Sequence, residues 1–200
     1  MHKKEIFALI AGFLIAVSGG LGYGYYLNQT NDPYDGYYDQ IVAEYHVHAD
    51  FAIYLNDVRL PLTDEKYMSS VEQIIHPDLH LHDGNQDLLH IHAQGLTFAN
   101  FLESIGMPLT NECLTDERGL QHCTGSGQEL ALFVNGERVN DIVGYIPKDA
   151  DRVLLYYGDL TNPNITGYVA GITDQACIYT GTCPERGTPP PEACGLTCEI

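Results

Sequence analysis

Hydrophobic and polar residues alternate at the start of the folded part of the chain. Every odd position from 45 to 55 is apolar or aromatic, whereas the even positions include His46, His48 and Asp50. A period of two is that of a β-strand with one buried face. Asn56-Asp57 then predicts a tight turn into a returning strand, with Val58, Leu60 and Leu62 on the apolar face and Pro61 at a sheet edge.

Similar signals continue to residue 158. In chain order they predict a hairpin over 79–93, a helix from Thr97 to Gly106, a hairpin around Asn135-Gly136 and a closing strand at 152–157. Hairpins with a single main helix predict an α+β fold. We expect a β-grasp-like arrangement, in which one helix lies across a mixed or antiparallel sheet.

The two ends of the chain have a different character. Residues 6–27 carry no charge and follow Lys3 and Lys4, so 1–27 is predicted to be a transmembrane anchor or a signal peptide. Residues 28–44 predict a short stalk, 45–158 the His-rich domain, and 159–200 a Cys- and Pro-rich tail. The positive-inside rule places everything after the anchor outside the cytoplasm, in a periplasm or on the cell surface.

The histidines form three His-x-His pairs, and the neighbouring odd-numbered positions Val47, Ala49, Leu79, Leu81, Leu89, Ile91 and Ala93 are apolar. Burying the apolar neighbours forces both histidines of a pair onto the opposite face of their strand. The hairpin over 79–93 keeps its two pairs on one face only if its loop has an odd number of residues. We therefore predict an odd loop over 83–87, which sets His80 opposite His90.

These positions predict a metal site on one face of the sheet. Imidazole with a carboxylate suits Zn²⁺ and Cu²⁺, so a copper or zinc ion is the expected cofactor and partner. The candidate ligands are His46, His48, Asp50, His76, His80, His82, His90 and His92. The alternative interpretation is that the histidines are polar residues of a solvated sheet face, and His122 is expected to be an ordinary loop residue.

Charge and cysteine content narrow the partners and the compartment. Nine Lys+Arg against 27 Asp+Glu give a net charge of −18, which argues against nucleic acid and favours cations. Cysteines of an exported chain are expected to be oxidised. Cys113 and Cys123 are predicted to pair, and three pairings are open to Cys177, Cys183, Cys194 and Cys198.

Residues 45–158 resemble a group of small membrane-anchored proteins of archaea and uncultivated bacteria, some of which carry the name protein-disulfide isomerase. The similar segments are 90–97, 101–106, 113–123, 133–137 and 151–158. The resemblance implies a single exported domain. No Cys-x-x-Cys spacing occurs in the chain, so the motif that would support disulfide isomerase chemistry is missing.

The leading hypothesis is a membrane-tethered extracytoplasmic domain that binds copper or zinc for uptake, buffering or delivery. A metalloenzyme is one alternative, either a hydrolase in which Asp50 or Glu44 acts as base on metal-bound water, or a superoxide dismutase-like protein. His46-Val47-His48 resembles the copper-ligand pair of secreted copper–zinc superoxide dismutases. A redox protein using Cys113 and Cys123, and a cell-surface interaction module with incidental histidines, are the others.

Overall fold

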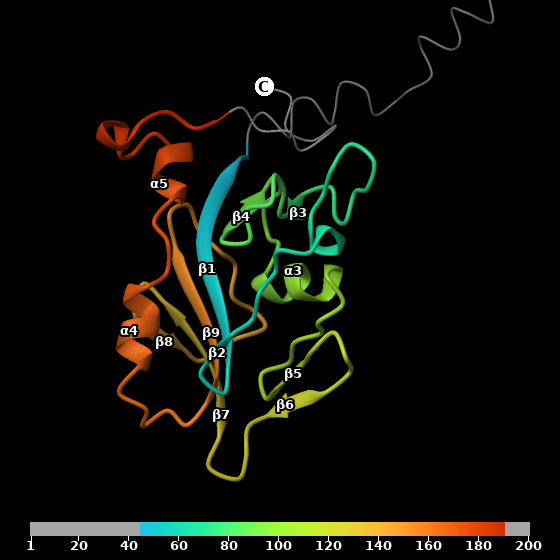
Figure 1. Cartoon of the computed structure of the whole chain (residues 1–200), viewed down its shortest axis with the longest axis vertical. Coiled ribbons are helices and arrows are strands. Elements are labelled where there is room, and N and C mark those ends of the chain that lie inside the picture. Colours follow the sequence, from blue (N-terminus) through green and yellow to red (C-terminus); the bar gives the residue numbers. More distant parts are fainter. Residues whose placement is uncertain (1–44, 191–200) are drawn as a thin grey trace, which may run out of the picture. The chain divides into compact units, whose positions relative to one another are not determined.

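A mixed β-sheet forms the centre of the structure, a computed structural model that describes residues 45–190. Its seven strands are β3 (Leu79–His80), β4 (Leu88–Ile91), β1 (Val47–Leu55), β9 (Arg152–Gly158), β7 (Glu129–Val134) and β8 (Glu137–Val139), in spatial order, with β2 (Val58–Arg59) beside β1. Strands β1 and β9 are parallel and lie side by side in the middle of the sheet, whereas the other pairs are antiparallel (Figure 1). A separate hairpin joins β5 (Cys113–Thr115) to β6 (Gln121–Cys123).

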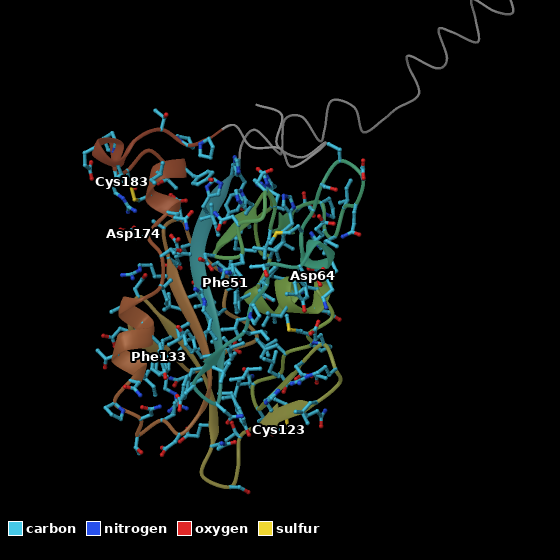
Figure 2. All side chains as sticks on the ribbon, viewed as in Figure 1. Phe51, Asp64, Cys123, Phe133, Asp174 and Cys183 are labelled. Carbon is cyan, nitrogen blue, oxygen red and sulfur yellow. A yellow bond between two sulfur atoms is a disulfide. The ribbon has the colours of Figure 1, made fainter. Side chains whose placement is uncertain are left out.

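One face of the sheet packs against α3 (Phe98–Ser104). The helix begins as predicted, because the Thr97 hydroxyl accepts from the backbone N–H of Asn100 and the Asn100 side chain accepts from that of Thr97. Phe51 of β1 points to this face, with its ring 5.7 Å from that of Phe98 and 5.3 Å from that of Phe101 (Figure 2). These aromatic contacts belong to the larger of two buried cores.

The opposite face is covered by the segment after β9. This segment forms α4 (Ile165–Ala170), α5 (Ala176–Tyr179) and the short 3₁₀ turn η2 (Pro184–Arg186). Figure 1 shows α4 and α5 on the side of the sheet away from α3. The Tyr168 ring stacks on Tyr54 at 4.2 Å, and Phe133 packs in the same small core beside α4 (Figure 2).

Two charged residues that face each other across β1 and β9 hold this segment in place. The carboxylate of Asp50 accepts hydrogen bonds from the Thr173 hydroxyl and from the backbone N–H groups of Gln175 and Ala176. The guanidinium of Arg152 donates to backbone carbonyls at the end of α4 and after it, including that of Ile172 at 2.6 Å. The covering segment is therefore fixed through its backbone groups and the Thr173 hydroxyl.

The α+β class, the main helix and the three hairpin positions predicted from the sequence are present in the structure. The Asn135-Gly136 turn has positive φ at both residues, as a tight hairpin turn requires. One expectation was wrong: Val58, the residue of β2 next to the turn, is 68% exposed, whereas Leu60 and Leu62 pack in the core as expected. The segment 60–78 contains the 3₁₀ turn η1 (Glu65–Tyr67) and no further strand.

Within 45–190, no helix combines the length and the apolar character that crossing a bilayer requires. The segments 1–27 and 28–44, for which an anchor and a stalk are predicted, lie outside the described residues.

Candidate metal centre

Three histidines form a row across β3, β4 and β1. His90 of β4 is the register partner of His80 on one side and of His48 on the other. The predicted pairing of His80 with His90, and with it the odd loop, is confirmed. Because side chains on one face recur every second residue, His46, His82 and His92 lie on the same face as this row.

The imidazole rings of this face are in contact with one another. The ring centroid of His90 lies 4.6 Å from that of His48 and 3.8 Å from that of His82, and His46 lies 4.5 Å from His48 and 4.4 Å from His92. One nitrogen atom from each of His46, His48 and His90 lies within 4.8 Å of the other two. A group of this kind can hold one metal ion, for which metal–nitrogen bonds of about 2 Å are needed.

The face that carries the histidines is buried. The side chains of His48, His80, His82, His90 and His92 are all buried. The interpretation of this face as a solvated one was therefore wrong for these five histidines. The rings lie on the face of the sheet that the segment after β9 covers, because His48 and Asp50 point the same way from β1.

Burial favours the neutral form of three of these imidazoles, those of His80, His90 and His92. Desolvation, followed by repulsion from neighbouring histidines, lowers the pKa of His92 to about 3 and the pKa of His90 well below its ordinary value. The pKa of His80 falls to about 4, mainly by desolvation and against the effect of its hydrogen bond to the His76 carbonyl. A neutral imidazole has the lone pair that a metal requires, so at neutral pH His80, His90 and His92 are in their ligating form.

Two of the predicted ligands are engaged elsewhere. Both carboxylate oxygens of Asp50 accept hydrogen bonds from the covering segment, so Asp50 fixes this segment rather than facing the rings. His76 is half-buried, its Nδ1 accepts from the backbone N–H of Asp78, and its carbonyl oxygen lies 2.8 Å from Nδ1 of His80. It therefore supports His80 from outside the ring cluster.

His122 belongs to another part of the protein. It is a buried residue of β6, where Nε2 lies 3.3 Å from a carboxylate oxygen of Asp116 and the ring packs edge-on against Tyr157. The expectation of a loop residue was wrong, because the β5–β6 hairpin encloses this side chain.

The cysteines of the described residues are all paired. A disulfide joins Cys113 to Cys123, as predicted, and a second joins Cys177 to Cys183. Of the pairings left open for the tail, the structure has the one that joins Cys177 to Cys183. Cys194 and Cys198 lie outside the described residues.

Tyr179 is a site residue that sequence reasoning missed. Its ring centroid lies 4.9 Å from that of His48 and 5.7 Å from that of His90. It belongs to α5, and the disulfide between Cys177 and Cys183 closes the loop that carries it. Nothing in the pattern around position 179 indicates that it meets a strand more than 100 residues earlier.

The fold and the site together define an α+β protein with a buried histidine group that can hold a metal ion. Comparisons with protein-family models, with curated proteins and with solved structures gave no match.

Proposed function

We propose that this chain is a membrane-tethered extracytoplasmic protein that binds a copper or zinc ion in its histidine group, for uptake, buffering or delivery of the metal. The observation that carries the proposal is the approach of three ligand nitrogens, from His46, His48 and His90, within 4.8 Å of one another. Imidazole ligands suit both ions, and the net charge of −18 attracts cations to the surface.

Compartment and fold are part of the same proposal. Two disulfides and the uncharged segment 6–27 support an exported chain that is anchored in a membrane, as in the small archaeal and bacterial proteins that it resembles. The spatial order β4-β1-β9-β7-β8, with parallel β1 and β9 and with α3 between β4 and β7 in the chain, supports a β-grasp-like assignment.

A binding role is preferred to the enzymatic and redox alternatives. Three histidines would leave a coordination position open for water, but the carboxylate of Asp50 is occupied by the covering segment and is not placed to act as base. All cysteines of the described residues are in disulfides. Cys113 and Cys123, the pair considered for a redox role, join the two strands of the β5–β6 hairpin.

Metal analysis of the purified full chain tests the proposal. The chain is incubated with Zn²⁺ or Cu²⁺, dialysed, and its metal content measured, for the natural sequence, for His48→Ala and for the control His122→Asn. We expect at least one ion per chain, loss of an ion in His48→Ala, and unchanged content in His122→Asn, with circular dichroism reporting that each variant is folded. Less than one ion per several chains would favour the interaction module instead.

A further inference from the structure

Next to the three-histidine group, two other histidines have their protons fixed by outer hydrogen bonds. In His80, Nδ1 lies 2.8 Å from the backbone carbonyl oxygen of His76. A carbonyl oxygen only accepts hydrogen bonds, so Nδ1 carries the proton and donates it. Nε2 of the neutral ring is then the atom with the free lone pair.

His82 is held in the same tautomer by a different partner. Its Nδ1 lies 2.8 Å from a carboxylate oxygen of Asp83, and an ionised carboxylate also only accepts. Metal-binding histidines characteristically donate their second ring N–H to a carboxylate or a backbone carbonyl, which orients the ring and raises its basicity. His82 donates to a carboxylate and His80 to a backbone carbonyl.

The two lone pairs are enclosed by protein. His80 is 1% exposed and His82 is 2% exposed, and neither Nε2 atom has a hydrogen-bond partner within the described part of the chain. A buried acceptor without a partner is destabilising, and in folded proteins such a group indicates an ion or an ordered water. Here two such acceptors lie on adjacent rings, with centroids 5.7 Å apart.

We propose that His80 and His82 form a second metal position, which binds another Zn²⁺ or Cu²⁺ ion beside the one held by the three-histidine group. His80 belongs to β3 and His82 follows it. In the first position, by contrast, His46 precedes β1 and His48 belongs to it. The ring of His92 lies 5.2 Å from that of His80, next to this position. This position uses neither His46 nor His48, so it can exist whether or not the first position is occupied.

The number of bound ions distinguishes the two positions. The full chain is dialysed against Zn²⁺ and its metal content is compared with that of His48→Ala and of the double variant His80→Asn/His82→Asn. Asparagine bears its amide nitrogen on Cγ, as histidine bears Nδ1, so this variant can keep the outer hydrogen bonds while it removes both Nε2 ligands. We expect two ions in the natural sequence and one in each variant.

Each other outcome of this experiment has a definite meaning. A single ion that is lost in His48→Ala and kept in the double variant would overturn the second position and indicate water between His80 and His82. A single ion that is lost only in the double variant would support the second position and contradict the first. No bound ion in the natural sequence would overturn both.

A surface variant tests the second position without changing a buried side chain. The carboxylate side chain of Asp83 is 48% exposed, so Asp83→Asn is expected to fold normally. It retains an acceptor for Nδ1 of His82 but removes the charge, and loss of such an outer partner weakens metal binding about 10- to 100-fold. Competition with a coloured chelator measures the two Zn²⁺ affinities, with Glu103→Gln on α3 as the charge-matched control. An unchanged pair of affinities in Asp83→Asn would count against the proposal.

Discussion

Acidification of the metal-free protein should weaken its fold, because three buried histidines bind protons less readily in the fold than in the unfolded chain. In the unfolded chain a histidine binds its proton near pH 6.5, whereas in the fold the pKa of His80 is about 4 and that of His92 about 3. The pKa of His90 is lowered as well. Between pH 6.5 and pH 4 the unfolded state therefore binds more protons, and the free energy of unfolding falls as the pH falls.

The size of this effect follows from the difference between the two states. Between pH 7.5 and pH 5, a histidine that titrates near 6.5 when unfolded and stays neutral when folded lowers the free energy of unfolding by about 2 kcal/mol. Three such residues, His80, His90 and His92, together lower it by about 6 kcal/mol. Domains of this size are stable by only about 5–15 kcal/mol, so the metal-free protein should be close to unfolding at pH 5.

Urea titrations in the presence of a chelator measure this loss at pH 7.5, 6.5, 5.5 and 5. Tyrosine fluorescence can report the transition, since the chain has 14 Tyr and no Trp. In His80→Asn one titrating ring is removed, so we expect the loss to be smaller by about 2 kcal/mol, whereas Glu103→Gln should follow the natural sequence. A loss below about 1 kcal/mol, unchanged in His80→Asn, would mean that the rings gain protons equally in both states and would refute the closed cluster.

Three further results are expected. Zn²⁺ at 100 times its dissociation constant should raise the free energy of unfolding by about 2.7 kcal/mol at neutral pH, and a chelator should reverse this; no shift would argue against binding to the folded state. Asp50→Ala leaves the Thr173 hydroxyl and the N–H of Ala176 without their acceptor, so it should lower the free energy of unfolding by about 1–3 kcal/mol. It should also speed proteolytic cleavage of the covering segment, and equal cleavage rates would argue against a role of Asp50 in fixing this segment. Cys113→Ser/Cys123→Ser should lower stability by about 3 kcal/mol while metal content is unchanged; loss of metal would contradict a purely structural disulfide.

The placement of the histidines on one face could be predicted because it depends on strand geometry alone. Side chains alternate with a period of two whatever the strand packs against, so the apolar neighbours of His80 and His90 decide where the imidazoles point. The turn at Asn135-Gly136 and the cap at Thr97 are similarly local, since each is specified within a few residues. These features needed no knowledge of the rest of the chain.

Burial of that face could not be predicted from the same pattern. The segment that covers it forms helices of only six and four residues, and neither has a side-chain cap to mark its start. Its attachment depends on contacts between distant residues, such as Asp50 with Ala176 and Arg152 with Ile172. Asp50 lies on the same strand face as His46 and His48, which made it a candidate ligand. The alternation of side chains along a strand gives no information about a partner that lies more than 120 residues later.

The covering segment gives the histidine face a property that neither element has alone. On an exposed sheet face, imidazoles would be hydrated, would titrate near pH 6.5 and would bind a metal only in competition with protons and water. Beneath a segment fixed by Asp50 and Arg152, the rings of His80, His90 and His92 remain neutral well below that pH. His80 and His82 each direct Nδ1 to an acceptor outside the cluster. The buried Nε2 atoms of His80 and His82, which have lost water without gaining a partner in the described part of the chain, make the cluster less stabilising than apolar residues would be. A metal ion bound to these atoms restores the lost interactions, so we expect the stability of the fold and the occupancy of the site to rise and fall together.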